Sequence, residues 1–139
     1  MKFKKKITSR IKQFREELKM PQLELAKLVG VSRQTIYYLE RGSYNPSLTI
    51  SFKISEILKK PIHDIFYQES VIKDILESKS LVELREIAEI AGTNLEKLAS
   101  LSEIDDEQLT KDFKKDLLIK IAVGMGIDFK DLFEKEDEN

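Results

Sequence analysis

Two neighbouring side chains, Arg33 and Gln34, carry functional groups that can read base edges in DNA. Arginine can donate two hydrogen bonds to guanine, and glutamine can pair with adenine through its amide. Thr35 and Tyr38 follow in the same stretch, and they can contact thymine methyl groups or phosphates. If these side chains share the exposed face of a helix, the set predicts direct readout of a DNA major groove.

The residues around this pair predict two short helices joined by a tight turn. Pro21 opens a helix over 22–29, and Ser32 caps a second helix over 32–41. Gly30 can adopt the positive φ that the turn requires. Two helices connected in this way form a helix-turn-helix, whose second helix can lie in the major groove.

Three further helices are predicted in the first half of the chain. Apolar spacing predicts a helix over 8–19, with Thr8 or Ser9 as its cap. The segment 48–54 alternates apolar and polar residues as a strand would, but its proline-serine start and the helical spacing that follows favour a helix. A fifth short helix is predicted after Pro61.

Three runs of sequence carry a family resemblance: Gln22-Leu23-Glu24-Leu25-Ala26-Lys27-Leu28-Val29-Gly30-Val31-Ser32-Arg33-Gln34-Thr35-Ile36, Leu39-Glu40-Arg41-Gly42 and Tyr44-Asn45-Pro46-Ser47-Leu48. They closely resemble the lambda-repressor and Cro type of helix-turn-helix domain, the XRE family, over residues 7–67. The resemblance implies five helices, the fourth of them after Asn-Pro-Ser. It also implies a sequence-specific transcriptional regulator that binds operator DNA as a dimer.

The resemblance implies roles for single residues as well. Gln22 is expected to contact phosphate and to brace Gln34, and Arg15 is expected to pair with Glu40. Pro21 departs from the serine or threonine cap that is usual in the family. Together with the readout chemistry, the resemblance predicts this DNA-binding set: Gln22, Ser32, Arg33, Gln34, Thr35, Tyr38, Arg41, Tyr44 and Asn45.

The formal net charge of −1 hides opposite charges in the two halves of the chain. Residues 1–69 hold 14 basic and 7 acidic side chains, net +7, whereas residues 70–139 hold 10 basic and 18 acidic ones, net −8. Such an asymmetry indicates nucleic-acid binding by the basic half. The lysines at positions 2, 4, 5 and 6 are expected to form a DNA-contacting arm, the alternative being a solubilising tail.

Composition argues against several other classes of protein. The chain has no cysteine and a single histidine, so disulfides, thiolate catalysis and Cys/His metal sites are not expected. His63 lies beside Asp64 with no nucleophile in motif spacing, which favours a surface histidine. No apolar run reaches the roughly 18 residues of a membrane span. We therefore expect a cytoplasmic protein without catalytic residues, cofactor, metal or membrane contact.

The second half also reads as helical. Three residue pairs fit the spacing of a capping box: Ser80 with Glu83, Thr93 with Glu96, and Asp105 with Gln108. Further helices are predicted within 67–80, over 114–124 and over 128–134. The predicted fold is therefore all-α throughout.

The second half further resembles a degenerate repeat of the first. An offset of 73 aligns Leu98 with Leu25, and an offset of 67 aligns Ile121 with Ile54. In this alignment Ser32-Arg33-Gln34 becomes Asp105-Asp106-Glu107, whose carboxylates would repel phosphate. The alternative is an unrelated helical tail whose leucines coincide with those of the first half.

Two domains are therefore expected. Residues 1–69 would form a five-helix, lambda-repressor-like DNA-binding domain, and residues 70–139 an acidic, degenerate helix-turn-helix domain for dimerisation or partner binding. The favoured function is a repressor whose partners are double-stranded operator DNA and a second copy of the chain, with the acidic domain open to a protein partner. The alternative is an antitoxin or anti-repressor that acts on another protein. A narrower hypothesis holds that the acidic domain masks the basic one.

Overall fold

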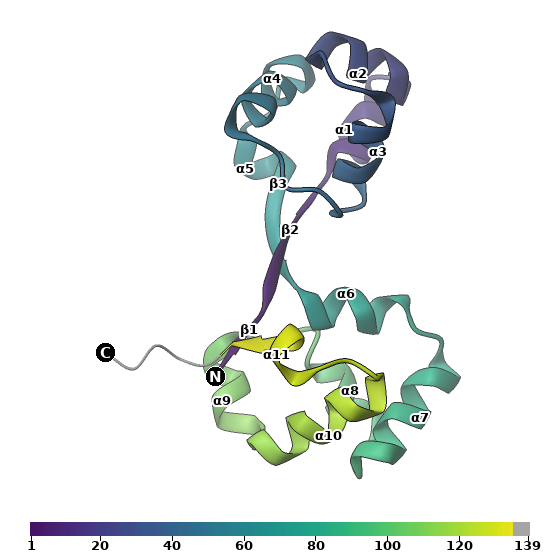
Figure 1. Ribbon diagram of the computed structural model, residues 1–139, viewed down its shortest axis with the longest axis vertical. Helices are drawn as coiled ribbons and strands as arrows, with labels where there is room; N and C mark the ends of the chain where they lie inside the picture. Colours follow the sequence, from purple (N-terminus) through teal and green to yellow (C-terminus); the bar gives the residue numbers. More distant parts are fainter. Residues whose placement is uncertain (135–139) are drawn as a thin grey trace. The chain divides into compact units, whose positions relative to one another are not determined.

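The computed structural model describes residues 1–134 and divides into two compact units (Figure 1). The first unit is Lys6–Gln68, and the second unit combines Met1–Lys5 with the chain from Glu69 onward. This division differs from the predicted domains, 1–69 and 70–139, chiefly in the first five residues, which pack with the second unit.

The first unit is built from five helices, as predicted. They are α1 (Ile11–Glu17), α2 (Gln22–Val29), α3 (Arg33–Glu40), α4 (Leu48–Leu58) and α5 (Ile62–Ile65), and strands β2 (Lys5–Ser9) and β3 (Phe66–Ser70) form a two-stranded sheet. Every helix contributes to one core, which includes the fully buried Ile11, Leu25, Ile36, Ile54 and Ile65. The segment with strand-like alternation is helical, with Ser47 as the N-cap of α4.

The first helix begins later than predicted, because β2 occupies the preceding residues. The predicted caps, Thr8 and Ser9, both lie in β2, and the Ser9 hydroxyl donates to the Leu39 carbonyl oxygen at 3.0 Å. The backbone N–H of Arg10 donates to the Ile65 carbonyl oxygen at 2.7 Å. Contacts with residues distant in sequence therefore override the local helical pattern here.

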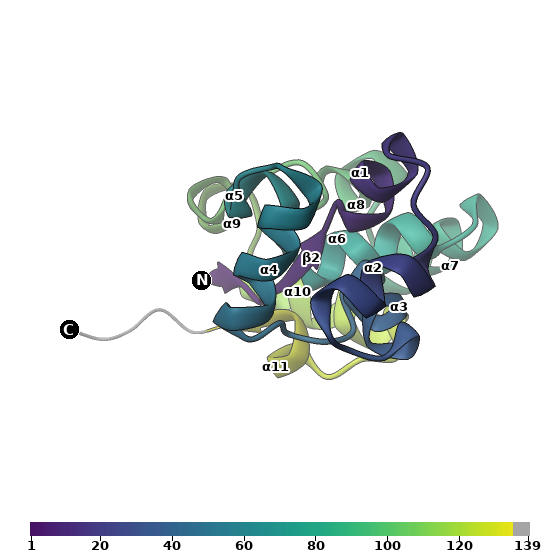
Figure 2. The same ribbon diagram turned by 90° about the horizontal axis from the view of Figure 1, so that it is seen from above.

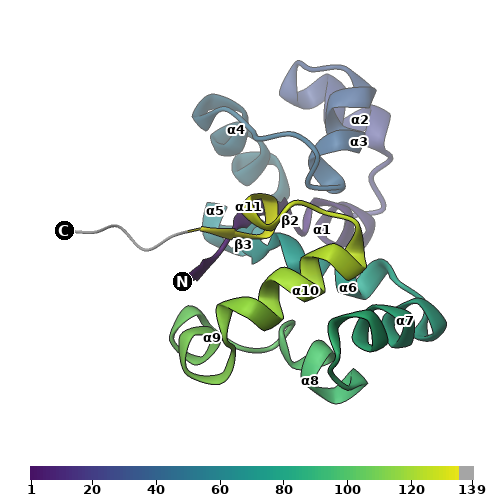
Figure 3. The same cartoon turned by 60° about the horizontal axis from the view of Figure 1, so that its bottom comes forward.

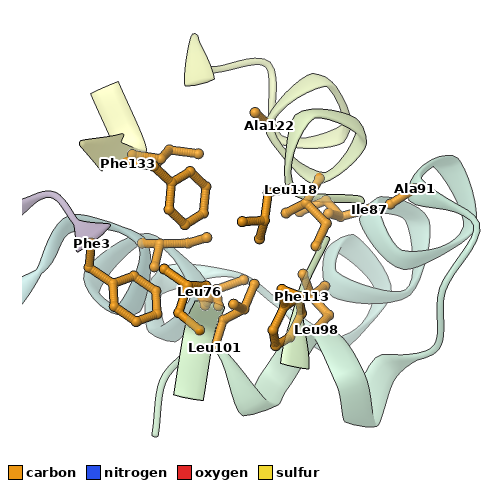
Figure 4. Packing of buried hydrophobic residues seen from close by; sticks show 14 of the residues in the cluster. Phe3, Leu76, Ile87, Ala91, Leu98, Leu101, Phe113, Leu118, Ala122 and Phe133 are labelled. Carbon is orange, nitrogen blue, oxygen red and sulfur yellow. The ribbon is translucent and has the colours of Figure 1, made fainter. Parts of the chain in front are cut away.

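The second unit contains the remaining helices and two short strands. In chain order they are β1 (Lys2–Phe3), α6 (Val71–Ser78), α7 (Leu81–Ala91), α8 (Leu95–Ser100), α9 (Asp106–Asp112), α10 (Lys115–Met125), α11 (Phe129–Leu132) and β4 (Phe133–Glu134). Strand β1 pairs antiparallel with β4, so that Phe3 lies opposite Phe133. Figure 3 shows α7 to α10 in succession, and Figure 4 shows the apolar core of the unit. Among residues 1–134, no helix is long and apolar enough to cross a membrane.

Two of the three predicted capping boxes are present. Ser80 caps α7 together with Glu83, and Asp105 caps α9 together with Gln108. The prediction for Thr93 is wrong, because Asn94 caps α8 and accepts a hydrogen bond from the Lys97 N–H at 2.7 Å. Asparagine ranks above threonine at this position, which accounts for the one-residue difference.

Four helices of the second unit begin at one of two offsets from helices of the first, whereas α7 begins 70 residues after α1 and α6 has no counterpart. Both ends of α10 lie 67 residues after the ends of α4, and both ends of α11 lie 67 residues after those of α5. Helices α8 and α9 begin 73 residues after α2 and α3. The match weakens within α8, where Ala99 is exposed although the aligned Ala26 is fully buried.

Two positive φ angles recur at the same offsets, but that of Gly30 does not, because Glu103, 73 residues later, has no positive φ. Lys19 has φ 54° and Gly92, 73 residues later, has φ 72°. Lys59 has φ 56° and Gly126, 67 residues later, has φ 71°. Positive φ is uncommon for residues other than glycine, so its presence at Lys19 and Lys59, aligned with Gly92 and Gly126, supports the alignment of these two helix ends.

Candidate nucleic-acid interface

The turn between α2 and α3 has the geometry that the sequence predicts (Figure 2). Gly30 ends α2 with φ 87°, a left-handed conformation. Ala26 is fully buried in the core of the first unit, and its helix packs against α3, so a small side chain suits this position. Ser32 then caps α3, its hydroxyl accepting the Thr35 N–H at 3.1 Å. These contacts fix the start of α3 relative to α2.

Helix α3 divides into a buried face and an exposed face. Ile36 and Leu39 are 0% and 1% exposed and anchor the helix in the core. Arg33, Gln34 and Tyr38 are exposed, as are Tyr37 and Arg41. The two predicted base-reading side chains therefore project from a helix whose position is set by packing on its opposite face.

A buried polar network holds α1, α2 and α3 together beneath this surface. Arg15 Nε donates to Glu40 Oε1 at 2.7 Å, and Arg15 Nη1 donates to the Met20 carbonyl oxygen at 2.9 Å. Gln22 Nε2 donates to the other Glu40 oxygen at 2.6 Å. The Arg15 and Glu40 side chains are only 10% and 6% exposed. The expected pairing of Arg15 with Glu40 is thus present.

The expected bracing of Gln34 by Gln22 is not the arrangement found. Gln22 uses its amide on Glu40, whereas Gln34 Nε2 donates to Tyr38 Oη at 3.2 Å. Gln34 and Tyr38 are one helical turn apart on the exposed face, which places their side chains within reach. The bond leaves the Gln34 carbonyl oxygen and its second N–H free to pair with a base.

A second polar pair continues this face towards the end of α3. Arg41 donates to Tyr37 Oη, and the Arg41 guanidinium lies 5.3 Å from the Tyr37 ring centroid. The Tyr37 and Tyr38 rings meet edge to face at 5.6 Å. Sequence reasoning did not single out Tyr37, although the four-residue spacing of Tyr37 and Arg41 signals such a pair.

The remaining predicted residues flank the two ends of α3. Ser32 and Thr35 lie at its N-terminus, with their hydroxyl oxygens 2.9 Å apart. Tyr44 and Asn45 are exposed in the connection that follows α3, and Gln22 is the first residue of α2. Backbone N–H groups at helix N-termini favour phosphate. All nine predicted DNA-binding residues belong to the first unit. They lie around the exposed face of α3 and the adjoining helix ends.

Some basic residues outside this set have other contacts. The Arg10 guanidinium lies 4.1 Å from the Tyr67 ring centroid and donates to the Asp64 carbonyl oxygen at 3.1 Å. Lys53 Nζ lies 3.5 Å from the Val29 carbonyl oxygen. These two cations therefore already have partners within the first unit.

Three of the four lysines of the predicted DNA-contacting arm, Lys2, Lys4 and Lys5, are part of the second unit, and Lys6 begins the first. Phe3 is 4% exposed in the core of that unit, and Lys5 Nζ donates to Asp106 Oδ2 at 3.2 Å. Burial of the aromatic ring and pairing with β4 explain why residues 1–5 do not extend from the first unit. The apparent arm of lysines is thus a paired strand followed by a salt bridge.

The single histidine of the chain lies on the surface of the first unit. His63 is 84% exposed and 3.5 Å from Asp64, which is a surface pair. No group of three or more His, Cys, Asp or Glu side chains in the described part of the chain could hold a metal ion.

The surface that corresponds to α3 is acidic in the second unit. Asp106 and Glu107 begin α9 at the positions of Arg33 and Gln34, and Asp105 caps it at the position of Ser32. Carboxylates at these positions oppose an approach to phosphate. Chemistry suited to DNA is therefore confined to the first of the two corresponding helices.

Comparison with known proteins gives a consistent result. The helix-turn-helix family HTH_3 matches residues 11–65, which run from the start of α1 to the end of α5. An HTH-type transcriptional regulator of Archaeoglobus fulgidus is 53% identical over 58 residues, which are 42% of this chain and 82% of the relative. One of Methanocaldococcus jannaschii is 44% identical over 61 residues, which are 44% of this chain and 92% of the relative. One of Bacillus subtilis is 34% identical over 61 residues, with the same coverage.

Proposed function

Because the chain belongs to the helix-turn-helix family of DNA-binding transcriptional regulators, we propose that it recognises a specific operator through α3 of the first unit. The observation that carries this proposal is the exposed face of α3, where Arg33 and Gln34 project from a helix anchored by Ile36 and Leu39. Arg33 would read guanine and Gln34 adenine. Access to operator DNA implies a cytoplasmic protein.

The other predicted residues would set position and affinity. Ser32, Thr35 and Gln22 lie at helix N-termini, where hydroxyl, amide and backbone N–H groups can bind phosphate. Arg41, Tyr44 and Asn45 would contact the DNA backbone from the C-terminal end of α3. The Glu40 carboxylate would orient Gln22 through the bond that the two side chains already make.

We further propose that two copies of the chain bind one operator and repress transcription from it. A single short recognition helix reads only a few base pairs, so two half-sites related by a two-fold axis are needed for a specific site. Repression follows if the bound dimer excludes other proteins from the same DNA.

For the second unit we propose a degenerate copy of the first, with a role in dimerisation or partner binding. The shared offsets of four of its helices and the two aligned pairs of positive φ support common ancestry. Its exposed apolar residues, with Val82 64%, Ile90 61% and Val123 68% exposed, offer surface for association. The masking hypothesis has less support, because Asp106 is already bonded to Phe3 and Lys5 of its own unit.

Selection of bound DNA from a random pool tests the function directly. We expect an enriched, two-fold symmetric sequence with half-sites about one helical turn, roughly 34 Å, apart. Binding that depends on salt but enriches no sequence would contradict operator recognition. Absence of DNA binding, with capture of a second protein instead, would favour the antitoxin or anti-repressor alternative.

A reporter gene carrying the selected operator tests the sign of regulation. Lower expression in the presence of the protein is expected, and higher expression would contradict repression. Sedimentation of the full chain and of an Ile90→Asp variant tests the second unit. A dimer that dissociates in the variant supports dimerisation through α7, whereas an unchanged dimer places the interface elsewhere.

A further inference from the structure

The first strand of the chain is held in the second unit by pairing with its last strand. Lys2 lies opposite Glu134 and Phe3 opposite Phe133 in the antiparallel pair β1–β4. The next N–H, that of Lys4, donates to the Leu132 carbonyl oxygen at 2.9 Å. The Phe3 ring lies 5.9 Å from the Phe133 ring, and Figure 4 shows both rings in the same apolar core. Residues more than 120 positions apart thus complete one core.

The start of α9 holds the opposite edge of the same strand. The N–H of Phe3 donates to Asp106 Oδ1 at 2.9 Å, and Lys5 Nζ donates to Asp106 Oδ2 at 3.2 Å. Successive N–H groups of an extended chain point to opposite sides. The Phe3 N–H therefore faces α9, and the Lys4 N–H faces the Leu132 carbonyl oxygen. The segment has backbone partners, a buried aromatic side chain and a charge partner.

The first unit fills the equivalent place differently. There β2 directly precedes α1, and its partner β3 directly follows α5. In the second unit β4 directly follows α11, but α6 and a short connection precede α7, and the partner of β4 comes from residues 2–3. A strand site is therefore retained in the second unit, while the strand that fills it comes from a remote part of the chain.

We propose that β4 and the start of α9 form a strand-binding site whose ligand is residues 1–5 of the same chain. The site selects an extended segment with an aromatic residue and a lysine two positions later. Backbone pairing supplies affinity, and the Phe3 pocket with the Asp106 carboxylate supplies specificity, as in other cases of strand addition. This inference goes beyond DNA binding and does not depend on it.

Addition of the segment in trans tests the proposal. In a chain in which a single methionine replaces residues 1–5, we expect the peptide Met-Lys-Phe-Lys-Lys to shift the amide signals of 105–110 and 132–134 saturably. A dissociation constant of about 0.1 mM or lower is expected, because attachment supplies an effective concentration of about millimolar order, which must exceed that constant about tenfold for the native segment to stay docked. The control peptide, with alanine in place of phenylalanine, should not bind.

Two outcomes of this titration would overturn the proposal. One is a folded second unit that shows no saturable change with the peptide, or an equal change with the control peptide. The other is a truncated chain whose second unit is unfolded and does not regain dispersed signals when the peptide is added. Recovery of those signals would support the proposal as strongly as binding to a folded unit.

Variants of the full chain provide a second measurement. Phe3→Ala should accelerate hydrogen exchange at Phe133 and Glu134 at least about tenfold, since it removes a buried aromatic ring. Asp106→Asn should act in the same direction with a smaller effect. Exchange in α2 and α3 should not change in either variant. Unchanged exchange throughout the second unit of Phe3→Ala would show that the segment is not required there.

Discussion

The two units have helices that can be aligned, but the aligned residues differ in chemistry. In the first unit Arg15, Gln22 and Glu40 form a buried polar network. The aligned positions in the second unit are Ala88, Leu95 and Phe113, of which Ala88 and Phe113 belong to its apolar core. On the surface, Arg33 and Gln34 correspond to Asp106 and Glu107.

The comparison indicates what the polar network contributes to the first unit. An apolar core is sufficient to hold the helices of the second unit together, so the polar network is not a requirement of the fold. In the first unit the network ties the end of α3 to α1 and to the first residue of α2. Two of these elements, α2 and α3, carry residues that we propose bind DNA. Buried ionic groups can favour one arrangement over others, and we infer that role for this network.

The largest expected effect is the loss of one partner from this network. Arg15→Ala leaves the Glu40 carboxylate buried without its charge partner, which should destabilise the first unit by about 3–5 kcal/mol. Residue-resolved hydrogen exchange of the full chain measures this unit separately from the second. The exposed Lys12 of the same helix provides the control, and Lys12→Ala should change little.

Replacing the three residues of the network with the aligned residue types of the second unit sharpens this prediction. The triple variant Arg15→Ala, Gln22→Leu, Glu40→Phe should recover most of the lost stability, because apolar replacement of a whole buried ionic group is often neutral or stabilising. It should still bind DNA less specifically, since α3 loses its polar ties. A triple variant less stable than Arg15→Ala alone would contradict the correspondence of the two networks.

The next effect is on DNA binding. Arg33→Ala should weaken binding to the selected operator by about 1–3 kcal/mol and relax one base position. Glu107→Ala, at the position that corresponds to Gln34, is the matched control and should leave binding unchanged. Competition with operator variants at fixed salt makes the measurement. An equal loss for all DNA sequences would assign Arg33 to phosphate contact.

Acid should weaken the strand contact of the second unit. Burial raises the pKa of Asp106, but hydrogen bonds from the Phe3 N–H and Lys5 and the charges of Lys5 and Lys2 leave the pKa below its ordinary value. Protonation is therefore easier in the unfolded chain, so this stabilisation is complete above about pH 4 and is lost as the pH falls further. Glu107 and Lys111, which line a surface pocket together with Asp106, are bonded to each other.

Hydrogen exchange at β4 between pH 5 and pH 3 tests this dependence, after correction for intrinsic rates. Protection should decline towards pH 3 in the native chain and should be weaker and less dependent on pH in Asp106→Asn. A decline of the same size in the variant would assign the pH dependence to another carboxyl group.

The smallest effect is expected at Tyr38. Tyr38→Phe keeps the ring but removes the acceptor for Gln34 Nε2, so preference at the base read by Gln34 should fall by about 0.5–1.5 kcal/mol. Tyr37→Phe provides the control, because it removes the contact with Arg41 and leaves Gln34 in place. Operator variants at that one base pair distinguish the two. Equal effects in both variants would contradict a positioning role for Tyr38.

Local sequence was sufficient for the features that depend on near neighbours. The caps at Ser32, Ser47, Ser80 and Asp105 each depend on a residue three positions away, and all four are present. The exposed face of α3 followed from helical spacing alone. By contrast, the pair Arg15–Glu40 was accessible only through family resemblance, because 25 residues separate its members.

The features that were missed depend on partners far along the chain. Residues 8 and 9 were included in the predicted helix over 8–19, yet they belong to a strand, because β3 lies beside β2. Lys2, Lys4 and Lys5 suggested a DNA arm because nothing nearby in sequence shows that Phe3 would pack on Phe133. Positive φ at Lys19 and Lys59 could not be predicted either, because glycine is the residue that usually indicates this conformation.

The central claim is that only the first of the two units reads DNA. Amide chemical shifts of the full chain, titrated with the selected operator, test it most directly. We predict saturable changes at Gln22, over residues 32–38 and at Tyr44 and Asn45, and none in α9 or residues 2–5. Changes in α9 with an unaffected α3 would contradict the claim.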